Sequence, residues 1–220
     1  MTKGTETRST ILDEAADLAS LTGLNGLTIG TLAAHTGMSK SGLFRHFGSK
    51  EQLQVETLRA GVDRFTTTVL RPALAKPRGR ARVQALFDGW LHWATDQGLP
   101  GGCLFIAASS ELDDQPGVAR DYLVENQRKW LDLIATTARR AVEAGDFRSD
   151  LDGDQFAYEF NALLLAFQQA NRLMRDPAAP QRARAQFDRL VRDAAAAGAE
   201  PAPPDLAPTL ADDSHSGDAA

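Results

Sequence analysis

Helical periodicity is the feature of this sequence that most restricts its fold. Apolar residues recur every three or four positions in almost every window between residues 7 and 197, and no stretch of strand length alternates with period two. Breaks rich in glycine and proline, such as TGLNG, KPRG, GLPGG and DDQPG, separate these windows, and no segment repeats. The sequence therefore predicts an all-α fold.

Length and cysteine content indicate the broad class of protein. A chain of 220 residues is long enough for one large or two small domains with buried cores. No apolar run approaches the roughly 18 residues of a membrane span, and the opening MTKGTETRST lacks the apolar stretch of a signal peptide. The single cysteine, Cys103, has no disulfide partner, which suits a reducing compartment. We expect a cytoplasmic protein that does not associate with membranes.

Residues 198–220 differ in composition from the rest of the chain. They are rich in alanine, proline and aspartate, show no apolar periodicity, and contain five acidic residues but no lysine or arginine. These acidic residues account for the whole formal net charge of −5, so the chain before them carries equal numbers of acidic and basic residues. A segment of this composition cannot bury enough surface to offset its ordering entropy, and it is predicted to be a disordered acidic tail.

The stretch TIGTLAAHTGMSKSGLFRHFGSK, residues 28–50, predicts two short helices joined by a turn at Gly37. Thr28 and Ser39 are good N-caps for these helices. A longer helix over residues 7–22 precedes them, and a further helix follows. The pattern is that of a helix-turn-helix whose flanking helices close a small core.

The second short helix carries small, hydrogen-bonding and basic residues on the face that its apolar residues do not use. Lys40 and Arg45 are on this face, and Lys50 begins the next helix. Such residues allow a helix to approach the major groove closely, while helix N-terminal amides can meet phosphates. A surface helix of mixed polarity in a helical bundle is the alternative, because the helix-turn-helix pattern is short and common.

The segment ILDEAADLASLTGLNGLTIGTLAAHTGMSKSGLFRHFGSKEQL, residues 11–53, resembles the N-terminal DNA-binding domain of the tetracycline-repressor (TetR) family of bacterial transcription regulators. The similarity rests on an ordered set of motifs, from the opening Ile-Leu-x-x-Ala through Thr-Ile-x-x-Leu-Ala and Gly-Met-Ser to Leu-Phe-x-His-Phe and Ser-Lys-Glu. The resemblance implies that Thr28 and Lys50 hold phosphates and that Phe44 and His46 touch the backbone or base edges. The DNA-binding residues assigned on these grounds are Thr28, Ser39, Lys40, Ser41, Gly42, Phe44, Arg45, His46 and Lys50.

Two positions depart from the usual family pattern. Phe44 occupies a position where tyrosine is usual, so one hydrogen bond to phosphate is absent. The glycine often found one residue earlier is Ser41 here, and Gly42 follows it. The base sequence that the helix reads therefore does not follow from that of relatives.

The remainder of the chain resembles the family's C-terminal ligand and dimerisation domain in layout. All three tryptophans and the cysteine fall in three neighbouring predicted helices, interleaved with alanine and glycine, which favours a cavity for a hydrophobic or aromatic effector. Aromatic stripes at helical spacing also pack ordinary cores, and this alternative stays open. The candidate effector-binding residues are Phe87, Trp90, Cys103, Phe105, Tyr122, Asn126 and Trp130.

Two apolar helices end the helical part of the chain, and they carry more apolar residues than one neighbouring layer needs. Pairing them with the same helices of a second copy gives a four-helix bundle about a two-fold axis, while packing within one chain is the alternative. A palindromic operator favours the dimer, because it requires two recognition helices roughly 34 Å apart. The predicted interface consists of Phe156, Phe160, Leu163, Phe167, Phe187, Leu190 and Val191.

Enzymatic and metal-dependent functions find no support in the sequence. The four histidines show no HxxxH or HExxH spacing, and no GxGxxG or GxxxxGK[ST] loop is present. The aspartate-rich segment DFRSDLDGDQF does not fit the register of an EF-hand. We expect no catalytic residue, no cofactor and no metal.

The sequence thus predicts a helix-turn-helix DNA-binding domain in residues 1–55, a helical effector-binding and dimerisation domain in residues 56–197, and the tail. The predicted function is that of a ligand-responsive transcription regulator. It is expected to be a repressor that binds a double-stranded palindromic operator as a homodimer and is released by a small effector, although activation remains possible. The alternative is an all-α small-molecule carrier or interaction module without DNA binding.

Overall fold

The computed structural model describes residues 3–197, apart from the side chains of residues 3–7, 96 and 97, so the predicted tail lies outside the described residues. Within this part of the chain the regular elements are all helices, joined by loops, with one isolated bridge between Phe147 and Ala195. The all-α prediction is confirmed. None of the helices between residues 3 and 197 is both long and apolar enough to cross a membrane.

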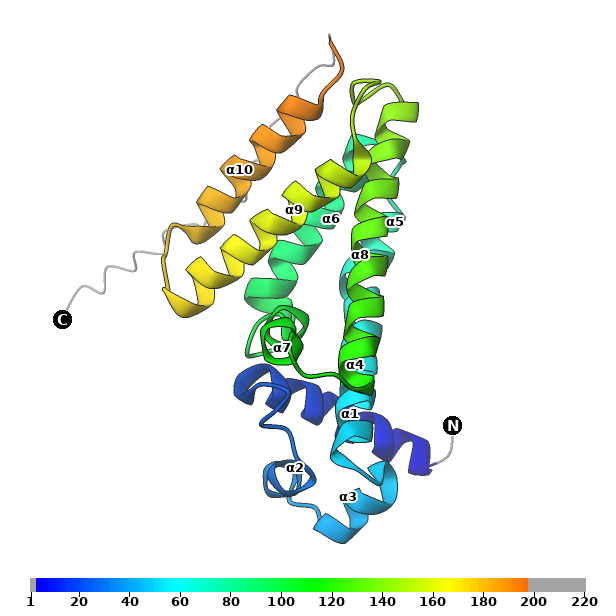
Figure 1. Ribbon diagram of the computed structural model, residues 1–220, viewed down its shortest axis with the longest axis vertical. Helices are drawn as coiled ribbons and strands as arrows, with labels where there is room; N and C mark the ends of the chain where they lie inside the picture. Colours follow the sequence, from blue (N-terminus) through cyan, green and yellow to red (C-terminus); the bar gives the residue numbers. More distant parts are fainter. Residues whose placement is uncertain (1–2, 198–220) are drawn as a thin grey trace, which may run out of the picture.

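Helices α1 (Lys3–Thr22), α2 (Ile29–Thr36) and α3 (Lys40–Phe47) form the lower end of the molecule in Figure 1. The predicted caps are confirmed. The Thr28 hydroxyl accepts the N–H of Thr31 at 3.0 Å, and the Ser39 hydroxyl accepts the N–H of Gly42 at 3.1 Å. Gly37 ends α2 with a φ of 69°, a conformation that glycine adopts without strain. The core of this domain contains Leu24, Leu27, Leu32, Leu43, Phe47 and Leu53, all buried.

Helix α4 (Lys50–Phe65) connects the two ends of the molecule. It packs against both α1 and α8 (Val118–Glu143), and the π-helical turn η1 (Thr66–Leu70) and α5 (Arg71–Leu74) extend it. The predicted domain division between residues 55 and 56 falls inside α4. One continuous helix therefore belongs to both domains.

The upper part of the molecule is a layered bundle in which α8 runs beside α4, and α9 and α10 lie together across α6 (Figure 1). Its remaining elements are α6 (Arg80–His92), η2 (Trp93–Gln97), α7 (Leu104–Leu112), α9 (Gly153–Gln168), η3 (Gln169–Leu173) and α10 (Ala179–Ala194).

Stacked aromatic rings form the centre of this bundle. The rings of Phe87 and Phe187 are parallel with centroids 4.0 Å apart, and the Phe160 ring meets both edge-on. Phe87, predicted from the sequence to bind an effector, lies in this aromatic centre and is not among the residues that line the cavity described below.

All seven side chains predicted for a dimer interface are buried within one chain, with exposed fractions between 1 and 8%. Helices α9 and α10 turn their apolar faces toward each other and toward α6 and α8, because that packing removes these faces from water without a second copy. Phe156, Phe160, Leu163, Phe167, Phe187, Leu190 and Val191 thus pack inside the single chain, as the intramolecular alternative expects.

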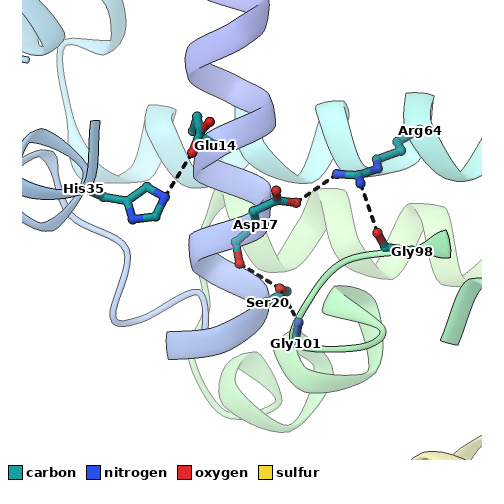
Figure 2. Close-up of polar contacts among 7 residues, drawn as sticks. All are labelled: Glu14, Asp17, Ser20, His35, Arg64, Gly98 and Gly101. Carbon is teal, nitrogen blue, oxygen red and sulfur yellow. Dashed lines mark hydrogen bonds and ion pairs between the residues drawn. The ribbon is translucent and has the colours of Figure 1, made fainter. Parts of the chain in front are cut away.

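Polar contacts join the two domains where α1 meets the loop before α7 (Figure 2). The guanidinium of Arg64 donates to the Asp17 carboxylate at 2.8 Å and to the carbonyl of Gly98 at 3.0 Å. The N–H of Gly101 donates to the hydroxyl of Ser20 at 2.8 Å. A Cβ atom at Gly101 would lie 1.7 Å from the Ser20 carbonyl oxygen, so only glycine permits this approach. On the DNA-binding side, the Glu14 carboxylate of α1 lies 3.0 Å from Nε2 of His35 in α2, and this contact links the two helices.

Candidate nucleic-acid interface and ligand cavity

The outer face of α3 presents two basic side chains and an aromatic ring. Lys40, Ser41, Phe44 and Arg45 are exposed, and 58% of Phe44 is accessible to solvent. Within the described part of the chain, Lys40 and Arg45 make no hydrogen bond or ion pair. An aromatic ring that is exposed between two available cations is typical of a surface that a partner covers.

The other predicted DNA-binding residues have partners inside the protein. The hydroxyls of Thr28 and Ser39 cap α2 and α3, and the half-buried His46 ring lies 6.1 Å from the ring of Phe47. The Lys50 ammonium donates to the backbone carbonyl of Asn25 at 2.8 Å. An ammonium carries three donor hydrogens, so this bond leaves Lys50 able to bind a phosphate as well.

A cavity of about 390 Å³ lies in the upper domain between α4, α6, α7, α8 and α9. Six of the seven predicted effector residues line it, namely Trp90, Cys103, Phe105, Tyr122, Asn126 and Trp130, and Phe87 does not. The sequence pattern did not reveal that α4 with η1, represented by Phe65 and Thr66, and α9, represented by Asn161, also line the cavity. Their apolar spacing showed that these helices were packed but not that they faced a cavity.

Aromatic rings at right angles to one another build the cavity wall. The Phe65 ring meets Trp130 at 5.5 Å and Phe105 at 6.2 Å, in both cases edge-on, and it also contacts Trp93. The Trp90 ring is fixed from behind by Phe167 at 5.8 Å. Such interlocked rings give rigid, flat walls suited to an aromatic ligand.

The cavity wall is almost free of charge. Burial raises the pKa of the Cys103 thiol, and burial is also the main reason why the pKa of Tyr122 is raised, so both groups are neutral near pH 7. Among the residues that line the cavity, Lys129 carries the one formal charge, and its ammonium lies 2.5 Å from the carboxylate of Glu125 on the exposed side of α8. The lining includes no carboxylate.

Three side-chain amides line the cavity, those of Asn126 and Gln127 on α8 and that of Asn161 on α9. The Asn126 amide donates to the carbonyl of Tyr122 at 2.7 Å, which leaves its side-chain oxygen as an acceptor. Asn161 reaches the cavity from α9. A ligand here can therefore pair a hydroxyl or N–H group with Asn126.

A second hollow, an open groove of about 860 Å³ between α1 and α4, has a different character. Both acidic and basic side chains line it, and several of them pair, as in the Arg8–Glu56 pair at 3.2 Å and the Arg64–Asp17 pair at 2.8 Å. Across the described residues, no three histidine, cysteine, aspartate or glutamate side chains gather in a way that would hold a metal ion. The aromatic cavity is the less open and less charged of the two hollows, and it is the better candidate for a ligand site.

Comparison with known families agrees with this arrangement of helices. Residues 11–57 match the family of bacterial regulatory proteins called tetR, and residues 79–187 match the tetracyclin repressor-like C-terminal domain. The chain belongs to the TetR family. Members of this family regulate transcription and are not enzymes, and the resemblance seen in the sequence is confirmed.

Individual relatives of this TetR-family regulator cover most of its length. The HTH-type transcriptional repressor KstR2 of Mycobacterium tuberculosis is 26% identical over 159 residues, which are 70% of this chain and 74% of KstR2. A TetR-family regulator from Cytophaga hutchinsonii superposes with a TM-score of 0.78 at 18% identity, covering 89% of this chain and 98% of its own. For a TetR regulator from Chloroflexus aurantiacus, the TM-score is 0.74 at 25% identity, with coverage of 87 and 96%.

Proposed function

We propose that this TetR-family regulator is a repressor that binds a palindromic operator as a homodimer and leaves it when an uncharged aromatic effector fills the cavity. The observation that carries the proposal is that the exposed basic face of α3 and the aromatic cavity occur in one chain and are joined by the continuous helix α4. The name of KstR2 as a repressor supports the direction of control. Such a protein acts at the DNA, in the cytoplasm.

On the DNA side, we assign base contacts to Lys40 and Arg45, whose side chains are exposed and have no partner among the described residues. Ser41 and Gly42 allow close approach of the α3 backbone. The Phe44 ring fits an apolar contact such as a thymine methyl group or a sugar. Thr28, Ser39, His46 and Lys50 lie around this centre and are assigned to the phosphate backbone.

Selection of operators from random DNA tests the placement of α3 in the major groove. We expect Arg45→Ala to relax the preference at one base position by about 1 to 3 kcal/mol, because a base contact carries sequence information. Lys50→Ala is expected to weaken binding to all sequences and to reduce the log-log salt slope by about one, because a phosphate contact carries charge alone.

The control for this experiment is Arg128→Ala, which removes an exposed arginine from α8 in the other domain. If Arg45→Ala and Lys50→Ala both select the wild-type sequence with unchanged preferences, α3 does not read the groove. If the wild-type protein selects no sequence at all, the chain is instead a carrier or interaction module.

On the ligand side, the composition of the cavity favours a neutral aromatic compound with a hydroxyl or N–H group. A cavity of about 390 Å³ accepts a small drug-sized molecule. A cationic ligand would lose its hydration without gaining a carboxylate, because none lines the wall. A polyanionic ligand would meet only Lys129, which Glu125 already neutralises.

The fluorescent probe N-phenyl-1-naphthylamine, a neutral aromatic amine with one N–H group, tests this assignment. We expect it to bind with an increase in its fluorescence. Asn126→Leu should weaken binding about fivefold through loss of one hydrogen bond, and Ile106→Trp should weaken it at least about tenfold by filling the cavity. Phe44→Ala, on the DNA side, serves as the control. Equal probe affinity in Ile106→Trp and wild type would place the binding site elsewhere.

For the homodimer, we propose the outer face of α9 and η3. The side chains of Tyr158, Leu165 and Leu173 are 71, 44 and 76% exposed, and their spacing places them along one side of the helix together with the exposed Ala162. An apolar stripe of this kind on the surface of a chain marks a contact site, and a two-fold axis beside it makes the stripe self-complementary.

A further inference from the structure

The turn between α1 and α2 is held by side chains from two distant parts of the chain. The N–H groups of Leu24 and Asn25 both donate to the carboxylate of Glu111 in α7, at 3.0 and 2.7 Å. The carbonyl of Leu24 accepts from the buried amide of Gln54 at 2.8 Å, and the carbonyl of Asn25 accepts from Lys50 at 2.8 Å. Helix α7 thus binds the backbone N–H groups of Leu24 and Asn25, and α4 binds their carbonyl groups.

The Glu111 carboxylate fits this turn closely. A Cβ atom at Gly23 would lie 2.5 Å from the nearer Glu111 oxygen, and Gly23 itself has a φ of 79°. Glycine at this position therefore serves the turn conformation and also leaves room for a carboxylate that comes from the other domain. Two parallel bonds from backbone N–H groups to an ionised carboxylate fix both the distance and the direction of the contact.

The opposite end of α7 forms part of the cavity. Cys103, which caps α7, and Phe105 and Ile106 in its first turn line the cavity wall, and Glu111 is near the last residue of the helix. A helix of this length is rigid, so a shift imposed at its first turn by a bound ligand reaches Glu111 with little loss. The contact with Leu24 and Asn25 then carries that shift to Lys50.

We propose that Glu111 is the positioning residue through which an occupied cavity controls the DNA-binding face. In the empty state, Glu111 fixes the α1–α2 turn. The carbonyl of Asn25 then holds the Lys50 ammonium where it can bind a DNA phosphate. A ligand that presses on Phe105 and Ile106 displaces α7, the turn follows Glu111, and the phosphate contact of Lys50 is lost. This inference rests on the proposed function, and it assigns the signal to α7 in addition to the continuous helix α4.

The experiment compares operator binding with and without N-phenyl-1-naphthylamine in wild type, Glu111→Ala and Ser110→Ala, using an operator selected from random DNA. In wild type we expect the saturating probe to lower operator affinity at least about tenfold and to reduce the salt slope by about one unit. In Glu111→Ala, probe affinity should stay within about twofold of wild type, while the effect on the operator falls below about threefold.

The control variants make the result specific to the carboxylate. Ser110→Ala changes the exposed neighbour of Glu111 in the same helix and should respond as wild type does. Glu111→Gln keeps one acceptor oxygen and should respond to an intermediate degree. A structural role alone would lower the unfolding temperature of Glu111→Ala and leave the response to the probe intact.

Each outcome separates this inference from the function on which it rests. If the probe weakens operator binding equally in wild type and Glu111→Ala, the role of Glu111 is refuted and the ligand-responsive repressor stands. If the probe binds the wild-type protein but leaves operator affinity unchanged, both the coupling and the ligand response are refuted. If no operator is bound, the proposed function itself fails.

Discussion

The double variant Tyr158→Glu, Leu165→Glu is expected to be monomeric and to bind the full operator at least about 100-fold more weakly than wild type. Both side chains lie on the outer face of α9 and are exposed in the single chain, so the monomer fold should tolerate the change. Two copies would bring four carboxylates together about a two-fold axis, in a contact that has to lose water. Light scattering gives the oligomeric state, and a gel shift gives the affinity.

Val118→Glu is the matched control, because Val118 is an apolar residue with 57% exposure at the start of α8. This variant should remain a dimer with wild-type affinity for the operator. If the double variant still scatters light as a dimer, the interface lies on another face. If it is monomeric but binds the operator as tightly as wild type, the protein does not need two copies to recognise DNA.

The second large effect concerns stability. Phe187→Ala is expected to lower the free energy of unfolding by about 3 to 5 kcal/mol, because it removes a ring that is 1% exposed and leaves a cavity in the aromatic centre of the upper domain. The lost contacts include the parallel stacking on Phe87 at 4.0 Å and the edge-on contact with Phe160 at 5.8 Å. Urea unfolding measures the change.

Gln186→Ala, an exposed neighbour in the same helix, should change stability by less than about 0.5 kcal/mol. A loss below about 1 kcal/mol in Phe187→Ala would mean that the aromatic centre repacks around the gap and that the stack of rings is not required. The comparison also tests whether Phe187 packs within one chain, since a residue whose main role is to contact a second copy would change dimerisation before it changed the stability of one chain.

A ligand response of the expected size requires only a modest coupling free energy. A tenfold loss of operator affinity corresponds to about 1.4 kcal/mol, and the operator must then weaken the ligand by the same factor. Two hydrogen bonds to an ionised carboxylate are strong enough to carry a coupling of this size. The contact of Glu111 with the α1–α2 turn is therefore adequate for the role assigned to it.

Local signals in the sequence determined the helix-turn-helix. As predicted, Thr28 and Ser39 each accept the N–H of a residue three positions later and Gly37 ends α2, and Ser49 caps α4 in the same way. These features depend on interactions within one turn of helix, so the residues that create them are adjacent in sequence. The exposed face of α3 is also determined locally, because the buried residues Leu43 and Phe47 set which side of the helix faces solvent.

Tertiary structure decided which partner each inward residue meets. Helical periodicity shows that Phe87 and Phe187 point away from water, but not that they stack on each other across α6 and α10 rather than on a ligand or a second copy. The partnership of Glu111 with Leu24 and Asn25 spans more than 80 residues and leaves no mark in the local pattern. Hydrophobic burial is non-directional, so a sequence specifies that a face is covered, whereas the packing of the whole chain specifies what covers it.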